Sequence, residues 1–314
     1  MGVFVFLPLV LPLTAWPVAR LAEQHLHPRT ATRLLAAVAG VLALCSTLCL
    51  ALLVVVGTAQ LPGNPLPDGW SDPEVRAAVP YDEVAGKAAI PALAGVLLCC
   101  AHVARRHGRV RRRAARALAG LPPRPVAVLP DRTPYAYALP GGPRGGRVVV
   151  TSGMLAALDG PERRALFAHE RAHLAGRHHR FLLTVQLAAR ANPFLRPLRT
   201  AVAYTAERWA DEEAAAAVGS RRAVARAIGK AGLVSRGAPV ATLAGFAGFA
   251  AAGPVPRRVA ALLGPPPAVR VWPPLSTTVG LAVWGAAAGA TISAASSANS
   301  AVTLYFILKA ATPL

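Results

Sequence analysis

The chain has 314 residues, of which 54% are hydrophobic and 15% charged, and Lys and Arg number 34 against 14 Asp and Glu. Such a composition excludes a disordered or collagen-like chain. The whole chain has a mean hydropathy of +0.44, and its uncharged runs of membrane-spanning length also exclude an ordinary soluble globular protein. The sequence therefore predicts an integral membrane protein that is mainly α-helical.

Four uncharged runs are long enough to cross a bilayer. The predicted spans cover about residues 2–19, 34–59 and 88–104, followed by one within 271–308. In the last run, Ser293 to Ser300 is expected to mark an exit or a break. The first run contains three prolines that should kink it: Pro8, Pro12 and Pro17. We interpret this run as a retained span and not a signal peptide, because it has neither a basic n-region nor a clean cleavage site.

The basic residues predict the orientation of these spans. Seven arginines between Arg105 and Arg116 follow the third run at once, whereas the loop 61–87 is predominantly acidic. The predicted location is a bacterial plasma membrane. The positive-inside rule then places residues 105–270 on its cytoplasmic side and both termini on its outer side. Because the arginine run adjoins a span, anionic lipid headgroups are its expected partner, and no nucleic-acid partner is expected.

Two further features bear on membrane insertion. All the cysteines lie in apolar runs, which favours neither a disulfide framework nor a zinc cluster: Cys45, Cys49, Cys99 and Cys100. The uncharged segment 238–256 is rich in Gly, Ala and Pro, and we expect it to lie at the interface or at the rim of a site. A true span there would reverse the predicted topology.

The cytoplasmic segment contains the HExxH motif His169-Glu170-Arg171-Ala172-His173. On a helix the two histidines share one face and can bind one zinc ion, while Glu170 can act on a metal-bound water. Chance gives such a pattern in a chain of this composition roughly 0.01 times, which disfavours two unrelated surface histidines. Asp159, Pro161 and Glu162 predict a capped start of this helix, and Gly176 predicts its end or a bend.

A catalytic zinc needs a third protein ligand, and two candidates compete. His179 would extend the motif to HExxHxxGxxH, but this pattern expects a downstream methionine turn, and the methionines Met1 and Met154 both lie upstream. Glu207 would give the His2Glu set, and it stands in an alanine-rich helical stretch that ends at Gly219. We favour Glu207 and expect His178 and His179 to face solvent or the lipid interface.

The same helical stretch offers a supporting carboxylate. Asp211 lies four residues after Glu207, so the two share a face, and one can ligate while the other accepts a hydrogen bond from a ligating imidazole. Glu212 and Glu213 are expected to point elsewhere. Upstream of HExxH, short strands separated by Pro and Gly turns are predicted at Val126–Leu129, Tyr135–Leu139 and Arg147–Thr151.

HExxH followed by Glu207-x-x-Ala-Asp211, set between a third and a fourth span, resembles the M56-type (BlaR/MecR-like) membrane zinc metallopeptidases. The related M48 gluzincin peptidases share both motifs. This resemblance implies zinc on His169, His173 and Glu207, with Glu170 as general base and Asp211 as support. It also implies a strand that pairs with an extended substrate. The implied domains are spans at 1–104, a cytoplasmic gluzincin domain at 105–270 and the fourth span with a tail at 271–314.

The predicted activity is zinc-dependent endopeptidase cleavage of a cytoplasmic or membrane protein. By resemblance, cleavage of a transcriptional repressor and turnover of membrane proteins are both open, and a non-catalytic membrane scaffold is the rival class. Antibiotic sensors of this type carry an extracellular penicillin-binding domain after the fourth span. Since the sequence stops at Leu314, we do not expect β-lactam sensing through such a domain. The oxyanion stabiliser is left open among Tyr204, Arg208, His178 and Arg258.

Overall fold

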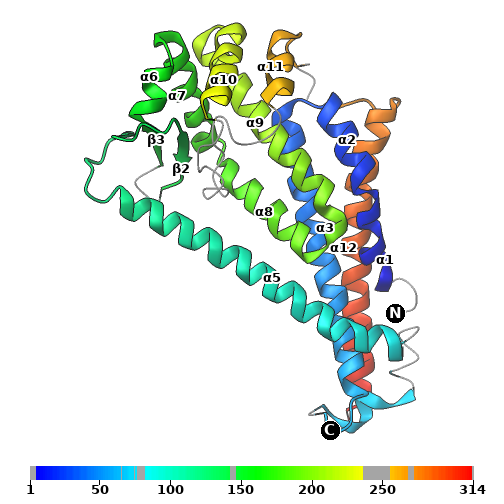
Figure 1. Ribbon diagram of the computed structural model, residues 1–314. Coiled ribbons are helices and arrows are strands. Elements are labelled where there is room, and N and C mark those ends of the chain that lie inside the picture. The colour runs from blue at the N-terminus through cyan, green and yellow to red at the C-terminus, as the bar shows by residue number, and fades with distance from the viewer. Residues whose placement is uncertain are drawn as a thin grey trace.

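A computed structural model of the chain describes residues 5–64, 66–73, 75, 82–141, 146–235, 255–267 and 272–312 (Figure 1). The fold is mostly helical with one small sheet, as predicted. The predicted interfacial segment 238–256 lies outside the described residues, except for its last two.

The N-terminal run does not form the single helix predicted at 2–19. It is divided into α1 (Leu7–Val10), the 3-10 helix η2 (Leu11–Thr14) and α2 (Ala15–His25). Pro8 and Pro12 each stand in the first turn of one of these pieces, where a residue without an N–H is tolerated. Prolines that were expected to kink one span thus divide it.

Within the described residues, three helices are long and apolar enough to cross a membrane. They are α3 (Pro28–Ala59), the Val84–Ala117 part of α5 (Asp82–Ala117), and α12 (Thr278–Ala310). The four predicted spans therefore correspond to three such helices and the divided N-terminal run. In addition, α5 continues through the whole arginine run that was expected to follow the membrane segment. Which side of the membrane each end faces remains a prediction.

A break at Ser293 to Ser300 is wrong, because α12 is continuous through these residues, while the alternative that the membrane segment ends there remains a prediction. Ser293, Ser297 and Ser300 are all buried, and their spacing of four and three residues places them on one face of the helix. The hydroxyl of Ser297 lies 3.6 Å from Cys49 Sγ on α3. These small polar side chains face the bundle interior and do not interrupt the helix.

A helical hairpin packs between the long helix α3 and the helix that contains the HExxH motif, α7 (Gly160–Ala175). It consists of α8 (His178–Ala191), the 3-10 turn η4 (Pro193–Leu195) and α9 (Arg196–Val218), and both helices pack along α3. Apolar residues of α2, α3, α8, α9 and α12 form a common core. Within it Asn192 Nδ2 donates to Ser46 Oγ at 3.1 Å, and Thr32 Oγ1 donates to Thr205 Oγ1 at 2.9 Å.

The predicted strands are confirmed as β1 (Val126–Leu129), β2 (Ala136–Leu139) and β3 (Arg147–Thr151), with the second beginning one residue later than expected. The order is β1-β3-β2, in which β1 pairs in parallel and β2 antiparallel with β3. This order makes β2 an edge strand. A second core joins the sheet to α6 (Ser152–Ala157), α7 (Gly160–Ala175), α9, α10 (Arg221–Val234) and α11 (Val255–Leu263).

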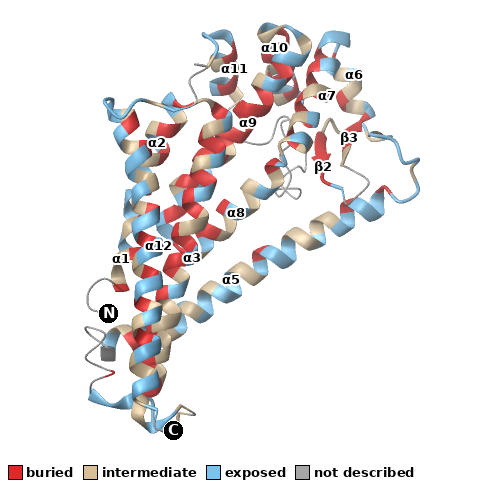
Figure 2. Ribbon diagram, turned by 180° about the vertical axis from the view of Figure 1, so that it is seen from behind, coloured by how far each residue is buried: buried red, intermediate tan, exposed pale blue. Residues whose placement is uncertain are grey.

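The two cores lie at different levels of an elongated molecule. Figure 1 shows the sheet, α6, α7, α10 and α11 gathered at one end, while α3 and α12 run to the opposite end, where the C-terminus lies. The 3-10 helix η3 (Asp68–Ser71) is near that far end, and α5 crosses diagonally from there to the sheet. Buried residues are concentrated along α3, α9 and α7, whereas α5 is exposed over most of its length (Figure 2). The division into domains at 104 and 270 remains a prediction.

Candidate metal centre

Helix α7 presents the HExxH motif in its last two turns. The predicted capping box is confirmed, because Asp159 Oδ1 accepts from the Glu162 N–H and Glu162 Oε2 accepts from the Asp159 N–H, each at 2.8 Å. The helix ends at Ala175 with Gly176 as its C-cap, as predicted. These signals fix the limits of α7, and His169, Glu170 and His173 are all buried along it.

Helix α9 brings Glu207 and Asp211 to the same place. Both carboxylates are fully buried and lie four residues apart, on one face of the helix. The helix ends at Val218, and its C-cap Gly219 has a φ of 75°, the left-handed conformation that favours glycine. Because α7 and α9 pack side by side, the two motifs meet although they are more than thirty residues apart.

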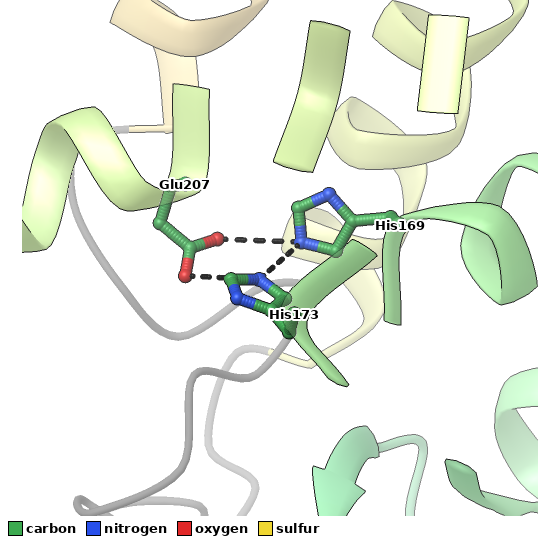
Figure 3. Close-up of side chains that lie close together, drawn as sticks. All are labelled: His169, His173 and Glu207. Atoms are coloured by element: carbon green, nitrogen blue, oxygen red, sulfur yellow. Dashed lines mark hydrogen bonds and ion pairs between the residues drawn. The ribbon is translucent and has the colours of Figure 1, made fainter. Parts of the chain in front are cut away.

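His169, His173 and Glu207 converge on one point (Figure 3). The two Nε2 atoms are 3.0 Å apart, and each lies 3.4 Å from one oxygen of Glu207. Metal–ligand distances of about 2.0–2.1 Å in a tetrahedral site put ligand atoms about 3.3 Å apart. Two imidazole nitrogens and a carboxylate oxygen at this spacing are a donor set suited to zinc, so the residues present fit the ion that the motif implies.

The remaining ring nitrogen of His169 faces Asp211. His169 Nδ1 lies 3.0 Å from Asp211 Oδ1, the juxtaposition predicted from the sequence. A carboxylate in this position fixes the tautomer and orientation of a ligating imidazole, leaving Nε2 for the metal.

Arg258 on α11 holds this carboxylate in turn. Its guanidinium donates to both oxygens of Asp211, at 2.9 and 2.6 Å, and its Nη1 lies 3.0 Å from Glu207 Oε2. The side chain is completely buried. Sequence reasoning named Arg258 only as one of several oxyanion candidates and missed this ion pairing, since no local pattern connects α11 to α9.

The prediction that His178 faces solvent or lipid is wrong. His178 is fully buried, with Nδ1 2.8 Å from Nδ1 of His173 and its ring 4.4 Å from the ring of Trp209. Arg177 adopts a left-handed turn (φ 50°) that folds the start of α8 back over α7. A Cβ on Gly176 would lie 2.4 Å from His178 Nε2, so glycine is required for this close approach. In the sequence, Gly176 indicates that α7 ends here. The burial of His178 depends in addition on the turn at Arg177, which the sequence alone does not show.

His179 and the other candidates lie apart from the converging atoms. His179 is half-buried and does not belong to the group of His169, His173 and Glu207. Glu212 pairs with Arg208 and Arg221, and Glu213 accepts from Trp209 Nε1 at 3.0 Å, so both point elsewhere as expected.

Of the open oxyanion candidates, Tyr204 is covered by the guanidinium of Arg257.

The centre concentrates charge in a buried volume. Glu170, Glu207 and Asp211 are each 0% exposed, and Arg258 is the buried guanidinium that ion-pairs with two of them. Burial lowers the pKa of the Arg258 guanidinium, but Asp211 and Glu207, and to a smaller extent Glu170, outweigh it and raise that pKa. Three carboxylates outnumber the single guanidinium, and a proton on His169, whose pKa is raised to about 9, offsets only part of the difference, so the centre keeps a negative charge that a divalent cation would neutralise. Burying such a charge without compensation is costly.

The protonation states follow from burial and these neighbours. Burial lowers the pKa of His173, and it lowers the pKa of His178 to about 2, so both rings are neutral at neutral pH. Burial alone would also lower the pKa of His169, but Asp211 and Glu207 outweigh it and raise the pKa to about 9. Burial raises the pKa of Glu207, yet Arg258 and the histidines hold it well below its usual range.

Residues 101–190, which include HExxH but not Glu207, match the family described as Peptidase family M48. Over 71 residues the chain is 39% identical to "Protease HtpX homolog" of Acidiphilium cryptum (strain JF-5), which is 23% of this chain and 24% of that relative. The match thus spans about a quarter of that relative's length. No solved structure matches. The similarity therefore supports a membrane-associated metallopeptidase of the M48 type, while the M56-type resemblance receives no separate support.

Proposed function

We propose that this protein is a membrane-embedded zinc metalloendopeptidase. The observation that carries the proposal is the convergence of His169, His173 and Glu207, with ligand atoms at distances suited to a tetrahedral metal, and the helix of the two histidines also carries the buried carboxylate of Glu170. The match of the HExxH region to Peptidase family M48 and the similarity to a protease HtpX homolog support the same activity.

Each residue then has a chemical task. When bound, zinc supplies a Lewis acid that acidifies water and polarises the scissile carbonyl. Glu170 takes the proton from the attacking water and passes it to the leaving amine. Asp211 keeps His169 in the tautomer that presents Nε2 to the metal. His178 contacts Nδ1 of His173 in the corresponding way and so orients that second imidazole. Arg258 keeps Asp211 and Glu207 ionised and in place.

The substrate is proposed to be a protein presented as an extended chain. Strand β2 is an edge strand of the small sheet and packs against α7, and within the described residues no strand pairs with its outer side, where a peptide could pair beside the motif helix. Long apolar helices in the same chain favour a membrane protein or a protein close to the membrane. A transcriptional repressor is one member of this class, and misassembled membrane proteins are another.

We further propose that the metal centre faces the cytoplasm. The arginines at the start of α3 and those at the end of α5 both lie towards the metal-centre end of these helices. The acidic loop 61–87 follows the other end of α3. This distribution agrees with the positive-inside rule for three or more spans.

The test is peptide hydrolysis or self-cleavage by the full chain in lipid nanodiscs, with wild type compared with Glu170→Gln. Removal of the base should lower the rate by about 10²–10⁴-fold while zinc is retained. Glu162→Gln is the matched control, because it makes the same chemical change on the same helix and glutamine still serves in a capping box. Unchanged hydrolysis in Glu170→Gln would refute the assignment. Zinc binding without hydrolysis of any protein would favour the non-catalytic scaffold.

A further inference from the structure

A second polar site lies behind Trp209, separate from the converging metal ligands. A solvent-open cavity of about 510 Å³ is bounded by the start of α3, the turn between α7 and α8, and the middle of α9. Its lining includes four arginines and one carboxylate: Arg29, Arg33, Arg177, Arg180 and Glu213. The metal ligands do not line it, since the rings of Trp209 and His178 stand between the cavity and His173.

The charge in this cavity is strongly unbalanced. Arg29 and Arg33 are one helical turn apart on α3, and both guanidiniums stand over the ring of Trp209, at 5.4 and 5.2 Å from its centroid. Glu213, the single carboxylate, is engaged by the indole N–H of Trp209. Within the described residues none of the four arginines is in an ion pair with an acidic side chain. Like charges gathered in this way repel one another, which an anion with several acceptor oxygens would offset.

An apolar groove continues from the arginines. A neighbouring cavity of about 770 Å³ shares Arg29 and Arg33 but is also lined by Leu34, Ala37 and Trp272. Leu34 and Ala37 begin the apolar part of α3, and the ring of Trp272 lies 5.6 Å from that of Trp284 in α12. Tryptophan at the ends of membrane helices typically marks the headgroup level. A cationic pocket that opens onto an apolar helix face at this level suits a ligand with an anionic head and a hydrocarbon tail.

We propose that this cavity binds the phosphodiester headgroup of an anionic phospholipid. The phosphate oxygens bind the guanidiniums of Arg33 and Arg180, and an acyl chain lies along Leu34 and Ala37. Guanidinium groups suit phosphate because they offer paired N–H donors and a permanent charge. This site is distinct from the arginine run Arg105 to Arg116, and the proposal does not depend on peptidase activity.

The experiment is native mass spectrometry of the delipidated full chain titrated with phosphatidylglycerol or with phosphatidylcholine. Wild type should bind one phosphatidylglycerol in preference to phosphatidylcholine. The double variant Arg33→Gln/Arg180→Gln should lose this preference by about tenfold or more, since each arginine near a headgroup contributes about 1 kcal/mol. Zinc content should be unchanged, which shows that the fold around His173 is intact.

The matched control is Arg112→Gln/Arg116→Gln, which removes the same charge from α5. It should keep the preference for phosphatidylglycerol. Equal binding of the two lipids by wild type, or loss only in the α5 variant, would overturn the proposal. Inorganic phosphate and a soluble acidic peptide serve as competitors. Displacement of the lipid by either one at a comparable concentration would also overturn it, because the tail would then contribute nothing.

Discussion

The bundle of long helices and the metal centre bury polar groups in different ways. Between the long helices, the buried polar side chains are neutral hydroxyl, amide and thiol groups. Ser46, Asn192 and Cys49 bond to other buried groups or to nearby carbonyls, whereas the hydroxyls of Ser293 and Ser300 have no hydrogen-bond partner within the described residues. At the metal centre, buried carboxylates lie in contact with histidines and with Arg258. Neutral hydrogen-bonded side chains are sufficient in a helix bundle whose role is structural. Buried ions are costly, and they are expected where their chemistry is used.

The largest expected effect on stability comes from removing the buried cation of the metal centre. Arg258→Met leaves Asp211 and Glu207 without their buried cation, and we expect a loss of about 3–5 kcal/mol in stability. The loss should be greater after metal chelation than with zinc bound, because zinc also neutralises these carboxylates. Unfolding of the detergent-purified chain, with and without chelator, measures both values.

The neighbouring arginine is the matched control. Arg257 is 45% exposed and pairs with Glu23, so Arg257→Met should cost less than about 1 kcal/mol. Similar losses for the two variants would contradict the contrast between the buried and the exposed ion pairs.

A smaller change at the same centre should affect metal affinity more than folding. Asp211→Asn keeps the shape of the side chain but weakens its hold on His169, and we expect zinc affinity to fall by about 10–100-fold. Chelator competition measures this affinity. Glu212→Gln, which alters a carboxylate on the same helix that pairs with Arg208 and Arg221, should leave affinity unchanged. If both variants bind zinc like wild type, Asp211 does not support the metal.

An effect confined to the fold, with the metal centre unchanged, is expected in the bundle. Gly86 on α5 touches Gly57 on α3 so closely that an added Cβ would lie 2.7 Å from the Gly57 Cα. Gly86→Ala should therefore destabilise the α3–α5 contact by about 1–3 kcal/mol without changing zinc content. Gly95→Ala, on the same helix with open space around it, should be neutral or stabilising by up to about 1 kcal/mol. Loss of zinc in Gly86→Ala would show that the two cores are not independent.

Local signals in the sequence predicted what depends on a few neighbouring residues. The capping box of α7, the three strands and the shared face of Glu207 and Asp211 all follow from short spacings, and the structure contains each of them. Their chemical roles remain predictions that the experiments above test.

The features that sequence reasoning missed depend on segments that meet only in the folded chain. His178 was expected on the surface because nothing in the local pattern shows that the turn at Arg177 folds it onto His173. Arg258 reaches the centre from a different helix, α11. The serines of α12 were interpreted as a break because their burial depends on α3 lying against them.

The most direct test of the central claim is the zinc content per protomer of wild type, Glu207→Gln and His179→Gln, measured by elemental mass spectrometry after purification without chelators. We predict one zinc in wild type, loss of most of it in Glu207→Gln, and full retention in His179→Gln, because Glu207 converges with His169 and His173 and His179 does not. Retention in Glu207→Gln together with loss in His179→Gln would contradict the proposed metal centre.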